Sequence, residues 1–346
     1  MITINPFGFQ TLTTAVNQMI PVPRFVTNLL FGRVETNATK TVMVDVIVGG
    51  QKVAPFVKRG NPARVIGNLG QKANIVEPPD IRLKKFLTPE DLFYTRGANA
   101  EMFVPGGIAG NDPIQQARQN RMAREQKDLK DIIDRTIEFL CCKGLGGSYS
   151  ITQDDGVFSI DFSMPAANKP TANVLWSSSA SAKPTSDMRS WKTIAQKASG
   201  HIPTVAIMNS TTYEAWIATA DVQNYLSKWK INIGQINTEQ STIDAGAEKR
   251  ATIDGVDYYV YDGIYIDSSG NQQSLIPDGR VALVSPQADH RLQFAGIEDL
   301  EAGVVVAQYF SKDWIEKDPS GLWLLVESHP LPTFNHPAAN IYATVL

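Results

Sequence analysis

The sequence predicts an α+β protein of 346 residues. Helical and strand-like segments follow one another without the regular strand–helix–strand alternation of a parallel α/β sheet. Residues 112–143 have helical periodicity over about nine turns, whereas residues 41–48 and several segments after residue 200 have the β-branched composition of strands. No internal repeat is present in the sequence.

The first 45 residues predict an N-terminal arm. Three prolines interrupt this stretch, and a short helical segment ends at Gly32. Residues 41–48 then read Thr-Val-Met-Val-Asp-Val-Ile-Val, a composition typical of a strand. We therefore expect residues 1–45 to form an extended arm more than a compact domain.

Residues 51–86 are basic, although the whole chain has a formal net charge of −3. The segment contains eight basic and two acidic side chains, a net charge of +6, and its scattered glycines and prolines disfavour a helix. Its charged residues are Lys52, Lys58, Arg59, Arg64, Lys72, Glu77, Asp80, Arg82, Lys84 and Lys85. Loops of this length without a core of their own are usually functional or disordered. We predict an extended β-ribbon loop over residues 46–90, with a solvated insertion as the alternative.

Residues 112–143 predict the longest helix. Asp112 supplies an N-cap, Pro113 occupies the first helical position, and Gly144 ends the helix. Its apolar stripe consists of Leu129, Ile132, Ile133, Thr136, Ile137 and Leu140. Opposite charges four residues apart are expected to pair on the polar faces, as Arg121/Glu125, Arg124/Asp128, Lys127/Asp131 and Lys130/Asp134. The helix would be a rod of roughly 48 Å, long enough to support several layers. A coiled coil is disfavoured because the heptad pattern does not persist through residues 113–128.

The elements after this helix alternate irregularly. We expect a hairpin over residues 149–164, a loop over 165–185, helices at 188–198 and 211–228, and strands at 204–209, 256–266, 281–284, 303–310 and 322–327. Pro330, Pro332 and Pro337 predict an irregular tail.

Composition excludes several classes of protein. The content of 43% hydrophobic and 19% charged residues is that of an ordinary globular protein. The nearly neutral charge argues against a dedicated nucleic-acid-binding protein, although one surface could still face nucleic acid. Cys141 and Cys142 are adjacent, so we expect buried thiols in a reducing compartment. No signal-like N-terminus or long apolar run is present, so we expect folding in a cytoplasm without membrane insertion.

Motifs for catalysis or metal binding are absent from the sequence. It contains no nucleotide-binding loop, nucleophile elbow or zinc-protease motif. His329 and His336 are separated by two prolines and have no metal-ligand spacing. Glu298, Asp299 and Glu301 form an acidic cluster without a neighbouring histidine, which favours a docking patch over acid–base catalysis. We therefore predict no catalytic, cofactor-binding or metal site, and a structural or binding role in place of an enzyme.

Several stretches carry a family resemblance through their order along nearly the whole chain. They are residues 30–33 (LFGR), 39–45 (TKTVMVD), 53–57 (VAPFV), 78–84 (PPDIRLK), 255–261 (GVDYYVY), 276–279 (IPDG), 311–319 (SKDWIEKDP) and 327–332 (ESHPLP). The last two are the most specific. Together they resemble the lambda-type major capsid protein family, the phage capsid protein E group. The order of arm, basic ribbon, spine helix, mixed domain and late strands is similar to the Hong Kong 97 phage capsid fold.

The resemblance implies a division into four parts. The N-terminal arm would comprise residues 1–45 and the extended loop residues 46–90. Residues 91–161 and 281–346, with the spine helix, would form a peripheral domain, and residues 162–280 an axial domain.

The resemblance also implies a function. The chain would be the major capsid protein of a tailed bacteriophage, assembling with itself as pentamers and hexamers into an icosahedral shell around packaged double-stranded DNA. The arm begins at the first residue, with no preceding scaffolding segment of the kind some proteins of this fold carry. We therefore expect scaffolding from a separate protein. A portal is a further expected partner, and a decoration protein is left open. DNA would meet the inner face without sequence-specific binding. The alternative is an encapsulin-like compartment shell of the same fold.

The charge pattern suggests how copies would meet. We hypothesise that the basic ribbon docks on an acidic part of an adjacent subunit, because complementary charge gives register and partner choice. The candidate residues are Lys58, Arg59, Arg64, Lys72 and Lys84 on the ribbon, and Glu298, Asp299 and Glu301, or the acidic residues of the spine helix, on the neighbour.

Overall fold

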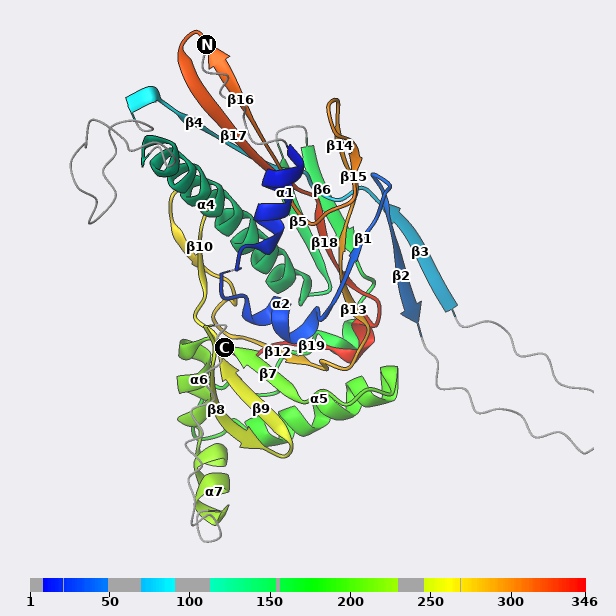
Figure 1. The fold of residues 1–346 in the computed structure, drawn as a ribbon. Coiled ribbons are helices and arrows are strands. Elements are labelled where there is room, and N and C mark those ends of the chain that lie inside the picture. Colours follow the sequence, from blue (N-terminus) through cyan, green and yellow to red (C-terminus); the bar gives the residue numbers. More distant parts are fainter. Residues whose placement is uncertain are drawn as a thin grey trace, which may run out of the picture.

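A computed structural model describes residues 9–20, 22–48, 70–90, 113–153, 156–229, 246–267 and 269–346 (Figure 1). Its longest element, α4 (Pro113–Gly144), matches the predicted spine helix. Leu129, Ile133, Ile137 and Leu140 are buried, as the stripe predicts, but Ile132 is exposed. Helix α4 ends at Gly144, where a side chain would overlap the ring of Phe334. Close packing therefore requires glycine at this position, since only glycine has no Cβ.

The N-terminal segment is less extended than we expected. It contains α1 (Phe9–Gln18) and α2 (Phe25–Leu30), and both helices lie against α4 or the sheet beside it. Val16, Phe25, Val26 and Leu30 are buried in the same core as the apolar stripe of α4. The prediction of an extended arm was wrong for residues 9–30. Their apolar residues recur at helical spacing, so as helices they pack against the hydrophobic core.

A five-stranded sheet organises the second core, in the order β19-β12-β7-β9-β8. Its strands are β7 (Val205–Met208), β8 (Glu248–Ile253), β9 (Val256–Val260), β12 (Arg280–Val284) and β19 (Ile341–Thr344). The helices of this region are α5 (Pro184–Ser199), α6 (Ser210–Ile217) and α7 (Ala220–Trp229). Trp176, Trp191, Trp216 and Tyr258 fill the core. The segment 162–280 therefore supplies three strands, and β12 and β19 come from the segment that we assigned to the peripheral domain.

Two predicted elements of this region are each divided in the structure. The helix expected over residues 211–228 is α6 followed by α7, and the backbone turns at buried Thr219, whose hydroxyl donates to the carbonyl of Trp216. The strand expected over residues 256–266 is β9 followed by β10 (Ile264–Ile266), which leaves the large sheet and pairs with β11 (Gln272–Ser274).

Smaller sheets cover α4. One has the order β16-β17-β4, from β16 (Phe310–Lys317), β17 (Ser320–Ser328) and β4 (Ile81–Leu87). Another has the order β1-β13-β18, from β1 (Arg33–Thr36), β13 (His290–Phe294) and β18 (Pro330–Phe334). The predicted hairpin is present as β5 (Ser148–Gln153) and β6 (Gly156–Asp161). The stretch expected as one strand over 303–310 contains β15 (Gly303–Val305) and the start of β16.

The tail that we predicted as irregular contains two strands, β18 and β19, separated by the short helix η2 (Pro337–Ala339). Pro330 and Pro332 lie in β18 at alternate positions, paired with Phe294 and Leu292 of β13. Because β18 is an edge strand, every second residue directs its backbone nitrogen away from β13. At these positions proline gives up no hydrogen bond of the sheet. The prolines therefore mark an edge strand, which our prediction missed.

A row of polar side chains on α4 is buried rather than solvated. Gln126, Lys130, Asp134 and Glu138 follow one another at four-residue spacing, so they lie on one face of the helix. We had placed the Lys130/Asp134 pair on an exposed polar face. Its Nζ–Oδ2 distance is 2.9 Å, as the spacing predicts, but both side chains are buried.

The N-terminal segment and the start of β16 supply the partners for this polar row. The backbone N–H groups of Val26 and Thr27, at the start of α2, donate to the Glu138 carboxylate over 2.8 and 3.0 Å, and the Thr27 hydroxyl donates over 2.6 Å. Helix α2 has no cap from its own N-cap side chain, so Glu138 replaces it from another helix.

The remaining members of the row hold other segments. Asp134 accepts from Arg24 over 3.1 Å and from the Tyr309 hydroxyl. Gln126 donates to the carbonyl of Leu12 over 3.2 Å and to the Ser311 hydroxyl over 2.9 Å. One face of α4 thus fixes α1, α2 and the start of β16 together.

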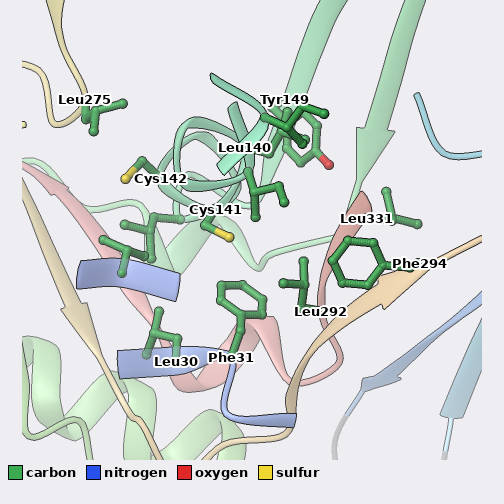
Figure 2. Packing of buried hydrophobic residues seen from close by; sticks show 14 of the residues in the cluster. Leu30, Phe31, Leu140, Cys141, Cys142, Tyr149, Leu275, Leu292, Phe294 and Leu331 are labelled. Carbon is green, nitrogen blue, oxygen red and sulfur yellow. The ribbon is translucent and has the colours of Figure 1, made fainter. Parts of the chain in front are cut away.

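Apolar packing continues this junction. Figure 2 shows Phe31 between the α4 side chains Leu140 and Cys141 and Leu292 of β13. Cys141 and Cys142 are buried free thiols, as predicted, and burial raises the pKa of both. His290 lies in the same region, with its ring centroid 6.0 Å from that of Phe31 and 5.1 Å from that of Phe334. Burial, together with the nearby His336 and His201, lowers the pKa of His290 to about 4.

Replacing Glu138 by alanine should destabilise the subunit by about 3 kcal/mol or more, because buried donors of α2 lose a charged acceptor. Chemical denaturation of the unassembled protein measures this change. Glu214→Ala, at an exposed glutamate of α6, is the control and should change stability by about 0.5 kcal/mol or less. Equal effects of the two substitutions would show that the Glu138 contacts do not hold α2.

Acid should destabilise the fold through His290. The unfolded chain takes up a proton on this residue below about pH 6.5, whereas the folded protein does so only near pH 4. Stability is therefore lost as pH falls from about 6.5 to about 4, by about 3 kcal/mol from this residue. His290→Gln should reduce the loss by that amount in denaturation curves across this range. An unchanged pH dependence would contradict the assignment.

Candidate functional site

The described part of the chain shows no arrangement of side chains that defines a metal centre. Within it, no group of three or more His, Cys, Asp or Glu residues is placed to hold a metal ion. Burial raises the pKa of Asp313 to about 6, but no second titratable group contributes to that shift. A buried group without a catalytic partner does not define an active site. None of the helices among the described residues combines the length and apolar character needed to cross a bilayer.

The surface instead presents elements that project from the body. The first is the ribbon of β2 (Val42–Val48) and β3 (Gly70–Val76), which pair antiparallel from Val42↔Val76 to Val48↔Gly70 (Figure 1). Val42, Val44 and Val46 face inward and are buried. Met43 and Ile75 lie opposite each other on the outer face, and Ile75 is 71% exposed. The described part of the ribbon confirms the predicted β-pairing and adds an apolar pair to it.

The structure describes two of the five basic residues that we predicted for the ribbon, Lys72 and Lys84. Lys58, Arg59 and Arg64 lie outside the described residues. Lys72 is in β3, opposite Val46, with a side chain that is not described.

Lys84 is not on the ribbon, because β4 leaves it and pairs with β17 in the sheet over α4. The Lys84 ammonium lies 4.8 Å from the centroid of the Trp323 ring, which itself stacks on Trp314. The assignment of all residues 46–90 to one ribbon was therefore wrong for β4. All seven residues of β4 pair with β17 instead.

The second projecting element is the acidic hairpin of β14 (Ile297–Asp299) and β15. Asp299 is occupied within the subunit, since its carboxylate pairs with Lys312 and accepts the backbone N–H of Glu301 over 2.9 Å. Burial disfavours the charged form of the Asp299 carboxyl group, whereas Lys312 and these hydrogen bonds favour it. Together they lower the pKa of Asp299. Glu298 and Glu301 are exposed and form no salt bridge within the described residues. Leu300 between them is fully exposed at the tip. The structure thus leaves two of the three predicted acids available to a neighbour.

A groove on α4 is a third surface, which sequence reasoning missed. It has a cavity volume of about 1020 Å³ between α4, β5 and the β10–β11 hairpin. Ile132, Ile264 and Ile266 are exposed along it, and Ile266 is 69% exposed. Phe139 of α4 and Tyr265 of β10 pack with ring centroids 4.6 Å apart. Two adjacent isoleucines in the α4 stripe were a usable signal, because one of them had to face away from the core.

The surfaces lie on different sides of the subunit. The groove is lined by α4, β5 and β10. In Figure 1, β10 lies on one side of α4, whereas the ribbon and the β14–β15 hairpin project on the opposite side. Such an arrangement suits heterologous contacts, in which one face of a subunit meets a different face of its neighbour. Exposed apolar residues at all three surfaces are typical of contact regions.

Among the solved structures that resemble this chain, two with TM-scores above 0.5 are a prophage capsid protein and a phage-related protein. The crystal structure of a protein assigned as the capsid protein of a prophage in E. coli CFT073 matches with a TM-score of 0.71 and 16% identity, over 99% of this chain and 100% of that chain. A phage-related protein from Bordetella bronchiseptica RB50 matches with a TM-score of 0.54 and 13% identity, over 97% and 96% of the two chains. The fold is thus that of the Hong Kong 97-type capsid proteins.

The sequence itself gives the family. The model of phage major capsid protein E matches residues 8–345, and the chain belongs to this family. It is therefore a phage major capsid protein, a component of the virion and a subunit of a self-assembling shell. A search of the curated proteins found no significant match.

Proposed function

We propose that the chain assembles as pentamers and hexamers into an icosahedral shell that encloses packaged double-stranded DNA, and that it has no enzymatic role. The observation that carries the proposal is the family match over residues 8–345. The surfaces of the subunit support it, because exposed apolar residues lie on opposite sides, as ring-forming subunits require.

The partners follow from the same proposal. A separate scaffolding protein, a portal and, where present, a decoration protein would act with the shell, and assembly would take place in the host cytoplasm. Packaged DNA would lie against the inner face without sequence-specific contacts, consistent with a chain of net charge −3. The peripheral and axial domains would meet at the five-stranded sheet, to which both contribute strands.

Electron microscopy of the full chain tests the function. Expressed with its scaffolding protein, portal and packaging motor, the protein should form icosahedral shells that fill with DNA. Shells that close around a protein cargo and never take up DNA would favour the encapsulin-like alternative. A chain that forms no regular particle under any of these conditions would overturn the proposal.

Within the shell, we propose that the basic ribbon of one subunit docks on the acidic hairpin of another. Glu298 and Glu301 are exposed and carry no salt bridge within the described residues, so they can pair with incoming cations without losing an internal contact. The Leu300 side chain between them offers apolar surface to the outer face of the ribbon, where Met43 and Ile75 are exposed. Charge sets the register of such a contact, and the apolar residues add buried area.

Reversing the ribbon charge should weaken assembly. Arg59→Glu with Arg64→Glu should lower shell yield, because the two glutamates would meet Glu298 and Glu301. Adding Glu298→Lys and Glu301→Lys should restore it. Light scattering during assembly at several salt concentrations measures the effect, which should shrink as salt screens the charges.

The control for this experiment is Lys169→Glu with Lys197→Glu, two exposed lysines away from the ribbon and the hairpin. It changes net charge by the same amount and should assemble normally. Reversed ribbon charges that leave assembly unchanged at all salt concentrations would refute the docking.

The groove on α4 should also contribute to assembly. Ile264→Ser with Ile266→Ser should reduce shell formation while changing subunit stability by about 0.5 kcal/mol or less, because both side chains are exposed before assembly. Denaturation of the subunit and particle counts by microscopy measure the two quantities. Ile202→Ser, an exposed isoleucine elsewhere, is the control. If it impairs shells as strongly, the groove has no special role.

A further inference from the structure

Both ends of the ribbon are held close to one short stretch of backbone, residues 294–296. Before the ribbon, the N–H of Asn37 donates to the carbonyl of Phe294 over 2.8 Å, and the N–H of Gly296 donates to the carbonyl of Thr39 over 3.0 Å. These bonds extend the pairing of β1 with β13 up to the start of β2. The chain that leads into the ribbon is thereby held by residues 294–296.

The chain that leaves the ribbon is held next to the same place. Asp80 precedes β4, and its Oδ1 lies 3.3 Å from Nε2 of His329. The same Nε2 lies 3.0 Å from Oε1 of Glu327, whose other oxygen is 2.9 Å from Nε of Arg82. The carbonyl of His329 accepts the N–H of Ala295 over 3.1 Å. His329 therefore connects the chain that leaves the ribbon to the backbone that holds the chain leading into it.

A salt bridge joins the two sides of the ribbon at its root. Lys40 Nζ lies 2.6 Å from Oε1 of Glu77. The pKa of Lys40 is raised first by this hydrogen bond and charge, and also by the charges of Asp80 and Glu298. Glu298 is in β14, and the hydrogen bond from Gly296 to Thr39 places the base of the hairpin beside the residue before Lys40.

The hairpin begins on the same backbone. Ile297, its first residue, is buried with Phe310 and Leu325. Gly296 immediately before it allows close approach, because a Cβ there would lie 2.9 Å from the carbonyl oxygen of Ala38. Residues 294–296 therefore hydrogen-bond to the chain that leads into the ribbon, and they continue directly into the first strand of the hairpin.

We propose that residues 294–296 and His329 form a common anchor that couples the β2–β3 ribbon to the β14–β15 hairpin, so that a neighbour bound to either element sets the direction of both. His329 acts in it as a positioning residue. The biological role of the coupling rests on the proposed function, in which both elements meet other subunits. The anchor itself is a property of the single subunit and is testable there.

Hydrogen–deuterium exchange of the full chain, before assembly and in shells, measures the coupling directly. Gly296→Ala should push the Ala38 backbone away and speed exchange of both the ribbon strands and the hairpin by about tenfold, whereas β7 and β12 keep their protection. His329→Gln, which retains a polar side chain, and Asp80→Asn should give the same paired effect with smaller size. Glu214→Ala, at an exposed position of α6 outside both the anchor and the proposed contact surfaces, should leave the ribbon and the hairpin unchanged.

The results distinguish the coupling from a merely structural role. Faster exchange confined to the ribbon or to the hairpin would overturn the proposal. Gly296→Ala or His329→Gln could also speed exchange in β7 and β12. In that case Asp80→Asn is the deciding variant, because the Asp80 side chain is 54% exposed and its replacement leaves the core intact.

Assembly is scored separately. Coupled exchange in a chain that forms no shells would leave the anchor standing and overturn the proposed function. Normal DNA-filled shells from a chain whose ribbon and hairpin exchange independently would overturn the anchor and leave the proposed function standing.

Discussion

The buried polar row on α4 is the interaction on which the rest of the subunit depends. Gln126, Lys130, Asp134 and Glu138 are removed from water, and such groups are tolerated only when hydrogen bonds and opposite charges satisfy them. Here the partners come from the N-terminal segment and from β16, far away in the sequence. Because hydrogen bonds are directional, these pairings fix the positions of the segments on α4 as well as holding them to it. Apolar packing around Phe31 completes the same junction (Figure 2).

This organisation leaves the contact surfaces outside the core. The ribbon, the acidic hairpin and the groove expose apolar residues, yet none contributes its exposed face to the folding of the single subunit. A shell protein needs this separation, because its subunits must fold first and then bury further surface against copies of themselves. The family match agrees with a molecule that works through contacts with copies of itself.

The two cores are joined through backbone as well as through packing. Strands β12 and β19 come from the last part of the chain but complete the sheet that β7, β8 and β9 begin. Between them in sequence lie the hairpin, two strands of each three-stranded sheet and the anchor at residues 294–296. The chain therefore leaves the second core after β12, forms the hairpin and four strands beside α4, and returns to the second core as β19.

The sequence by itself determined the elements whose signals are local. Helix α4, β2, the β5–β6 hairpin, the lack of catalytic motifs and the family resemblance all follow from residue type and short spacings. Only the tertiary structure decided which faces are covered. It buried the Lys130–Asp134 pair, turned Ile132 outward, took β4 from the ribbon to β17, and made a strand of Pro330–Phe334. The physical reason is that periodicity reports which residues share a face, whereas the partner of that face comes from distant parts of the chain. Asp299 is occupied and Glu298 is available for the same reason, because Lys312 lies within reach of only one of them.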